Sequence, residues 1–166
     1  MYKSSHKHKL DTPKIGVLLT NLGTPDAPTI KAVRPYLKEF LSDPRVVQPP
    51  PPRWLWLLIL NGFILNTRPK KSAKAYQRVW TTHGDGSPLM DISIKQKNAI
   101  EIELNRRAPG QFVIALGMRY GRPSIDSALQ ELESEDCEKV IVLPLYPQHA
   151  SSTTDSTFDA VSEAIQ

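Results

Sequence analysis

The sequence predicts an α/β fold, an open and mainly parallel sheet with helices flanking it. Three short runs are apolar throughout, as expected for strands covered on both faces, and they lie at Ile15–Leu19, Phe112–Leu116 and Val140–Leu143. Segments with helical spacing separate these runs. Alternation of strands and helices is typical of parallel strands joined by right-handed crossovers.

The first helix is expected at Thr29–Leu41, where the apolar residues fall on one stripe and Pro28 suits the first turn. Pro35 predicts a kink inside it. A longer and less regular helix is expected at Leu89–Arg107. A third is expected at Ser124–Glu135, with Ser124 as its N-cap.

The 94 residues from Thr20 to Val113 are too many for one simple crossover, so we expect an inserted region at about 45–88. Pro49–Pro52 predicts a stiff polyproline II spacer. The apolar segment Trp54–Leu65 follows, and it is too short to span a bilayer, which needs about 20 residues. Three interpretations remain open: a helix packed in the core, a flap over a pocket, or a membrane-surface contact framed by Arg53 and Arg68.

The composition is that of one globular domain. The chain has 166 residues, of which 40 % are hydrophobic and 23 % charged, and it has a single cysteine. A chain of this length buries roughly 70 % of its unfolded surface, which excludes a disordered protein, a collagen-like fibre and a disulfide framework. Acidic neighbours disfavour a thiolate at Cys137, so we interpret it as unreactive in a reducing compartment.

The net charge of +4 is concentrated at the start of the chain, since residues 1–14 contribute +3. Residues 1–13 lack the apolar core of a signal peptide, and we expect a disordered tail there. The remaining residues are nearly neutral in sum. They show no spread of basic and aromatic residues along a face, so nucleic acid is not expected as a partner.

Ligands of open α/β sheets bind beyond the carboxyl ends of the strands, which selects the loops Asn21–Ala27, Gly117–Pro123 and Pro147–Thr154. The first loop lacks the glycine pattern and the lysine of nucleotide-binding loops, so dinucleotide binding is not supported. The third is rich in hydroxyls before a helix, which suits either an anion or simple capping. Its His149 is a candidate metal ligand without visible partners, or a cleft-lining side chain.

A second group of candidates lies in the inserted region. The turn Gly84–Pro88 places Ser87 just before a helix, and Arg68 and Tyr76 precede it in the chain. A guanidinium, a phenol and a hydroxyl near one another suit a ligand that carries carboxylates. The alternatives are a helix cap, a surface arginine and a core tyrosine.

Several segments, in the same order along the chain, together resemble bacterial ferrochelatases. They are Leu18–Pro28, Tyr36–Val47, Arg68–Ala73 with Tyr76 and Trp80, Gly86–Leu89, Gly117–Gly121 and Leu143–Gln148. The resemblance implies insertion of ferrous iron into protoporphyrin IX to form haem. It also implies a Rossmann- or flavodoxin-like chelatase fold, in which two similar α/β domains enclose the porphyrin. Residues 14–166 would be the incomplete, amino-terminal first domain, and the carboxy-terminal domain, absent here, would be its partner.

Carried over by position, five residues would bind the porphyrin: Leu22, Arg68, Tyr76, Ser87 and Tyr146. The segment Trp54–Leu65 would form a lip of the pocket that faces the membrane. We therefore expect a cytoplasmic protein, with peripheral contact to the cytoplasmic membrane as a further possibility.

The resemblance assigns no catalytic residue to this segment. The family's base and metal site are a histidine in a Ser-x-His-x-x-Pro-type motif and a downstream glutamate, and no histidine here has a proline three residues on. We expect the segment alone to be inactive. Ser151 stands where some members carry an iron–sulfur cysteine, so no cluster and no bound cofactor are expected. Two alternatives stay open: a non-catalytic porphyrin- or haem-binding module, and a chelatase for another metal or porphyrin.

Overall fold

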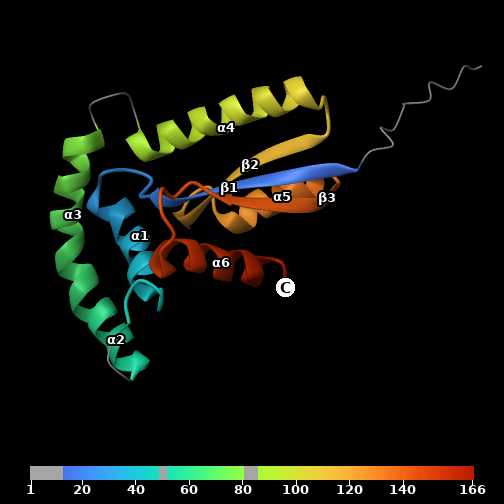
Figure 1. Ribbon diagram of the computed structural model, residues 1–166. Helices are drawn as coiled ribbons and strands as arrows, with labels where there is room; N and C mark the ends of the chain where they lie inside the picture. Colours follow the sequence, from blue (N-terminus) through green and yellow to red (C-terminus); the bar gives the residue numbers. More distant parts are fainter. Residues whose placement is uncertain (1–12, 49–51, 81–85) are drawn as a thin grey trace, which may run out of the picture.

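The computed structural model describes residues 13–48, 52–80 and 86–166, and its sheet contains three parallel strands in the order β2-β1-β3 (Figure 1). The strands are β1 (Lys14–Thr24), β2 (Phe112–Gly121) and β3 (Cys137–Pro144). The predicted open parallel sheet with flanking helices is therefore confirmed. The predicted tail up to residue 12, most of the proline spacer and part of the Gly84–Pro88 turn lie outside the described residues.

Six α-helices and two π-helical turns accompany the strands in the described part of the chain. They are α1 (Ile30–Ser42), α2 (Arg53–Ile59), η1 (Leu60–Ile64), α3 (Leu65–Trp80), α4 (Pro88–Arg107), α5 (Ile125–Ser134), η2 (Ser151–Asp155) and α6 (Ser156–Ala164).

Local sequence signals fix where two of these helices begin. The hydroxyl of Thr29 accepts a hydrogen bond from the amide of Ala32 at 3.3 Å, which caps α1. Ser124 accepts one from the amide of Ser127 at 3.1 Å, which confirms it as the N-cap of α5. Each cap satisfies an amide that has no partner inside the helix.

The alternation of side chains along β1 divides the core between two layers of helices. Val17 and Leu19 pack in one cluster with Ile114 of β2 and with residues of α4. Leu18 points the other way and packs with Leu132 of α5 and with α6. Figure 1 shows α4 on one side of the sheet and α5 and α6 on the other. The central strand is thus buried on both faces.

The edge strand β3 departs from the predicted burial. Val140, Ile141 and Leu143 are 41 %, 51 % and 45 % exposed, so the expectation of two covered faces is wrong for this strand. Ile141 and Leu143 pair with Val17 and Leu19, and they therefore face the side that carries α4. Because α4 packs on β1 and β2, it leaves this part of β3 uncovered.

The strands also run further than their apolar segments. Asn21 pairs with Met118 and Gly23 with Tyr120, so most of the two predicted loops Asn21–Ala27 and Gly117–Pro123 is strand. The reason is that a parallel ladder is held by backbone hydrogen bonds, which continue in register whether or not the side chains are apolar. The loops proper begin at Pro25 and Arg122.

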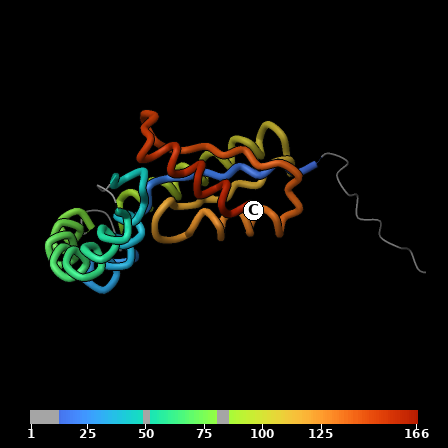
Figure 2. Tube along the Cα trace, turned by 90° about the horizontal axis from the view of Figure 1, so that it is seen from below, coloured from blue at the N-terminus to red at the C-terminus, as the bar shows by residue number. Residues whose placement is uncertain are grey.

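Helices α1, α2 and α3 form a second centre of packing at the carboxyl end of the strands (Figure 2). The buried Leu60 and Leu65 join Val33 and Tyr36 of α1 in one apolar cluster. The indole of Trp56 donates a hydrogen bond to the carbonyl of Leu41 at 3.0 Å. The predicted apolar segment Trp54–Leu65 is therefore helical and only half embedded, because its opposite face is exposed.

A substitution at Gly23 tests the close contact between β1 and β2. Gly23 has φ +97°, and a Cβ there would lie 1.8 Å from the carbonyl oxygen of Tyr120. Gly23→Ala should therefore lower the free energy of unfolding by about 3 kcal/mol, from backbone strain and the steric clash together. Urea unfolding followed by circular dichroism measures it.

The matched control is Gly62→Ala, because a Cβ at Gly62 has no neighbour within 4 Å. It should leave the stability within about 1 kcal/mol of the wild type. Equal losses in both variants would contradict the importance of the β1–β2 contact.

Candidate binding site at the carboxyl edge of the sheet

The carboxyl edge of the sheet is organised by one buried carboxylate. The side chain of Asp43, which follows α1, is 3 % exposed. Its Oδ2 accepts hydrogen bonds from Arg119 Nη2 at 2.7 Å, Tyr120 Oη at 2.7 Å and Ser156 Oγ at 2.5 Å. Asp43 thus joins α1, β2 and α6 at a single point.

Arg119 completes this cluster, which we call the Asp43 cluster (Asp43, Arg119, Tyr120 and Ser156). Its Nε donates to the carbonyl and hydroxyl of Ser156 at 2.9 and 2.6 Å, and its guanidinium lies 4.6 Å from the centre of the Tyr120 ring. A buried charge is tolerated only when paired and hydrogen-bonded. The cluster meets both conditions.

The ionisation of these groups follows from their surroundings. Burial alone would raise the pKa of Asp43, but hydrogen bonds from Ser156 and Tyr120 and the charge of Arg119 outweigh it and lower the pKa. Burial raises the pKa of Tyr120. The cluster is therefore an ion pair with a neutral phenol at ordinary pH.

Tyr146 lies beside this cluster, in the loop that follows β3. Its phenol shares a hydrogen bond with Thr157 Oγ1 at 3.0 Å, and Thr157 is fully buried. Burial raises the pKa of Tyr146. The predicted site residue Tyr146 is thus held by the first turn of α6, adjacent to Ser156.

Leu22, predicted on the first loop, instead lies on β1 and is positioned by its neighbour Asn21. The Asn21 amide accepts from the backbone N–H of Leu22 at 2.8 Å and donates to Ser93 Oγ of α4 at 3.1 Å. Leu22 is half-buried and packs against the apolar cluster of α1, η1 and α3. The carboxyl end of β1 is therefore tied both to α4 and to the cluster of α1, η1 and α3.

Tyr76 lies against that same apolar cluster. Its ring meets Tyr36 and Trp80 edge-on, at centroid distances of 6.2 Å in both cases. Arg68 projects from the same helix and is exposed. The structure thus brings Leu22 and Tyr76 to one cluster, with Arg68 two helical turns before Tyr76.

Ser87 is the N-cap residue of α4 and is 7 % exposed. Its hydroxyl makes no capping hydrogen bond to the helix, unlike Thr29 and Ser124. No hydrogen bond in the described part of the chain joins Ser87 to Tyr76 or to Tyr146.

His149 is exposed and pairs with one carboxylate. Its Nε2 lies 2.9 Å from Asp155 Oδ1, and the side chain is 69 % exposed. Within the described ranges, no group of three or more His, Cys, Asp and Glu side chains could hold a metal.

Asp155 also belongs to an exposed ion-pair network around Arg45. The Arg45 guanidinium binds Asp159 through two hydrogen bonds of 2.7 and 3.1 Å, and it donates to Ser151 Oγ at 3.3 Å. A hydrogen bond from Ser151 and the pairing with His149 lower the pKa of Asp155. The loop after α1 is therefore bound to the start of the last helix by charge as well as by the Asp43 cluster.

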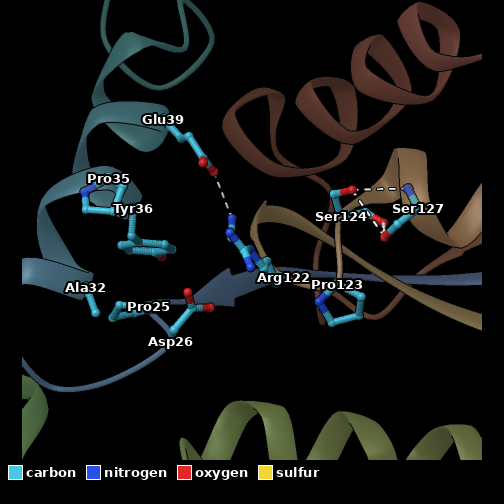
Figure 3. Close-up of a pocket in the computed structure, with 11 residues that line it drawn as sticks. Pro25, Asp26, Ala32, Pro35, Tyr36, Glu39, Arg122, Pro123, Ser124 and Ser127 are labelled. Carbon is cyan, nitrogen blue, oxygen red and sulfur yellow. Dashed lines mark hydrogen bonds between the residues drawn. The ribbon is translucent and has the colours of Figure 1, made fainter.

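A cavity of about 440 Å³ lies apart from these residues, between α1 and the turn from β2 to α5 (Figure 3). Tyr36 and three prolines form its walls, with Asp26, Glu39 and Arg122 among its polar residues. Glu39 accepts a hydrogen bond from the amide of Gly121 at 2.8 Å, which fixes one wall. None of the predicted porphyrin-binding residues lines this cavity.

Sequence reasoning did not single out the Asp43 cluster as a site. Arg119 and Tyr120 lie within the family motif Gly117–Gly121, and a charged residue at the end of a buried strand is itself a signal. Asp43 lies two residues after the predicted helix Thr29–Leu41, within the motif Tyr36–Val47. Ser156 carried no signal, because its burial depends on how α6 packs against β2.

Together, these features define an α/β protein with a buried polar cluster at the carboxyl edge of a parallel sheet. The ferrochelatase family model matches residues 14–166. The chain belongs to the ferrochelatase family, as its motifs indicated.

Curated relatives agree with this assignment. The chain is 64 % identical over 154 residues to a ferrochelatase of Hydrogenovibrio crunogenus. The matched region covers 93 % of this chain and 41 % of that protein. It is 53 % identical over 165 residues to a ferrochelatase of Teredinibacter turnerae, covering 99 % of the chain and 44 % of the relative. It is 55 % identical over 153 residues to ferrochelatase 2 of Shewanella oneidensis, and this match covers 92 % of the chain and 45 % of that relative. The chain thus spans less than half the length of these relatives.

Removing the charge of Asp43 tests the cluster. Asp43→Asn should lower the free energy of unfolding at pH 7 by about 3 kcal/mol, because Arg119 loses its buried partner. The folded-state pKa of Asp43 is lower than the unfolded one, so the stability that its ionisation contributes is present above about pH 4. That contribution is lost as the pH falls through the folded-state pKa.

Urea unfolding of the wild type and of Asp43→Asn, from pH 7 down to pH 2, measures this contribution. The difference between their free energies of unfolding should shrink at the acid end. Asp26→Asn is the control, because Asp26 is exposed and takes part in no hydrogen bond or ion pair among the described residues. A constant difference at every pH would contradict the role of the Asp43 charge.

Proposed function

We propose that this chain supplies one wall of the porphyrin pocket of a ferrochelatase, which inserts ferrous iron into protoporphyrin IX to form haem. The observation that carries the proposal is the family match over residues 14–166, with 64 % identity to a named ferrochelatase. The substrates are the metal ion and the porphyrin. The partner is the remainder of a family-length protein, which would supply the facing wall.

The proposed wall suits a flat apolar ring with two carboxylates. Leu22 would contact the macrocycle, while Arg68, Tyr76 and Ser87 would meet the ring and its propionates. Tyr146 would line the side of the cleft. A guanidinium and a hydroxyl are good partners for carboxylates, and an aromatic face is a good partner for the ring.

Rigidity is the physical requirement of the chemistry. Metal insertion needs the macrocycle to be bent so that its nitrogen lone pairs point toward the metal, and a wall that yields cannot hold that strain. Leu22 is held by Asn21, and Tyr146 by Thr157. Both lie next to elements that the Asp43 cluster joins, so this wall is well suited to resist the ring.

We assign the base and the metal-inserting residues to the remainder of the protein. In this chain, His149 has a single carboxylate partner and remains a weak candidate for metal contact. No iron–sulfur ligand is expected here, since Ser151 stands where some family members carry the cysteine ligand. The chain alone would therefore bind the porphyrin without turnover.

We also propose that the exposed face of α2 and η1 forms a lip that contacts the membrane, in a cytoplasmic protein. Trp54, Leu58 and Phe63 are 61 %, 62 % and 67 % exposed, although they are among the most apolar residues of the chain. Exposed aromatic and aliphatic side chains on one helix face are typical of interfacial contact. In the described part of the chain, no helix is long and apolar enough to cross a bilayer.

A fluorescence titration with protoporphyrin IX tests the proposed wall. The wild-type chain should bind saturably, and Ser87→Ala and Arg68→Ala should each weaken binding about tenfold, since each removes a hydrogen bond to a charged propionate. Arg107→Ala is the control, because Arg107 is exposed on α4 and pairs with Glu103 at 2.7 Å.

Ferrous iron added to the same samples should give no haem. Haem formation would contradict the assignment of the catalytic groups to the remainder of the protein. Equal affinities for the control and both variants would overturn the assignment of Arg68 and Ser87. Tight binding of haem as well as porphyrin would favour a non-catalytic binding module.

A further inference from the structure

The positive charge of the chain is distributed very unevenly in space. Residues 53–80, which form α2, η1 and α3, contain six Lys and Arg and no Asp or Glu. Their net charge is +6, whereas that of the whole chain is +4, so the remaining residues sum to −2. We call α2, η1 and α3 the basic arm.

The basic residues of the arm are directed to solvent. Lys70 and Lys71 lie four and three residues before Lys74, and Arg78 lies four residues after it, so the four residues share one face of α3. All four are exposed, as are Arg53 and Arg68. The buried residues of α3, among them Pro69 and Ala73, occupy the opposite face, which packs on α1.

The structure pairs none of these six cations with a carboxylate among residues 13–48, 52–80 and 86–166. On α4, by contrast, the basic residues pair with carboxylates. Lys95 pairs with Asp91, and Arg106 and Arg107 pair with Glu103, each at 2.7 Å. An uncompensated row of cations on one helix generates a positive field, which attracts an extended anionic partner.

The exposed apolar face of α2 and η1 is continuous with this row along the chain. α2 leads through η1 directly into α3 without a loop. Figures 1 and 2 show these helices at the outer end of the molecule, away from the helices that cover the sheet. An apolar, aromatic surface beside a basic one is the pattern of segments that lie at the surface of an anionic bilayer.

We propose that the basic arm binds the anionic headgroups of a lipid membrane, with the cations of α3 on the headgroups and the lip in the interface. The inference rests on the membrane contact proposed above and specifies its lipid class. A nucleic acid would also be attracted by the charge. A nucleic acid would, however, leave Leu58 and Phe63 in water. A lipid surface accounts both for the row of cations on α3 and for the exposed apolar face of α2 and η1.

The test is sedimentation of the 166-residue chain with vesicles of phosphatidylcholine alone or mixed with phosphatidylglycerol. The wild type should bind the mixed vesicles much more tightly. Raising the salt from about 0.05 to 0.5 M should weaken this binding strongly, because the Debye length falls several-fold. The variant K70Q/K71Q/K74Q should bind the mixed vesicles roughly a hundredfold less tightly, since each surface cation strengthens binding about fivefold.

The matched control is K95Q/R106Q/R107Q, which removes the same charge from α4. It should keep the wild-type affinity, and circular dichroism checks that every variant is folded. The lip variant W54S/L58S should lose binding to both kinds of vesicle. The porphyrin titration is run on the same proteins without vesicles. Its outcome does not depend on lipid, so it tests the porphyrin wall separately from the membrane contact.

The two proposals fail in different ways. Equal binding of the wild type to both kinds of vesicle, or an α3 variant that binds like the wild type, would overturn the role of the basic arm and leave the lip intact. Wild type that binds RNA but neither kind of vesicle would overturn both membrane proposals. A failed porphyrin titration with the expected vesicle results would overturn the porphyrin wall alone.

Discussion

The pairing of one buried carboxylate with one guanidinium is the constraint on which the carboxyl edge of the sheet depends. Asp43 follows α1, Arg119 and Tyr120 come from β2, and Ser156 opens α6, yet all four meet within hydrogen-bonding distance. Leaving either charge unpaired in this place would cost several kcal/mol. Elements distant in sequence are therefore held in one arrangement, and the loop that carries Tyr146 is fixed beside them.

The molecule combines this rigid edge with an exposed arm, and the two regions have different physical characters. The edge is built from polar groups that satisfy one another in a buried setting. The arm leaves both its cations and part of its apolar surface in solvent. Such groups gain little from the fold itself, so their exposure is best explained by what they contact. In the proposed function, the edge restrains a porphyrin and the arm rests on the membrane that holds so apolar a substrate.

The candidate site could be predicted in part. The strand-end rule and the family motifs both pointed to the carboxyl edge, where Tyr146 and Leu22 are found. Tyr76 lies on α3 and Ser87 at the start of α4. The Asp43 cluster was missed as a site, because Asp43 and Arg119 are 76 residues apart and no local pattern pairs them. The basic arm was missed because summing the charge over most of the chain made it look neutral.

By itself, the sequence determined the local elements of this protein and its family. Apolar runs located the strands, helical spacing located α1, α4 and α5, and Ser124 marked a helix start, because these signals act over a few residues. The tertiary structure alone decided that β1 continues to Thr24, that Ile141 and Leu143 stay exposed, and that the cations of α3 face solvent. Each of these depends on which distant segment lies alongside, and that is fixed by the register of the ladder and by the packing of helices on it.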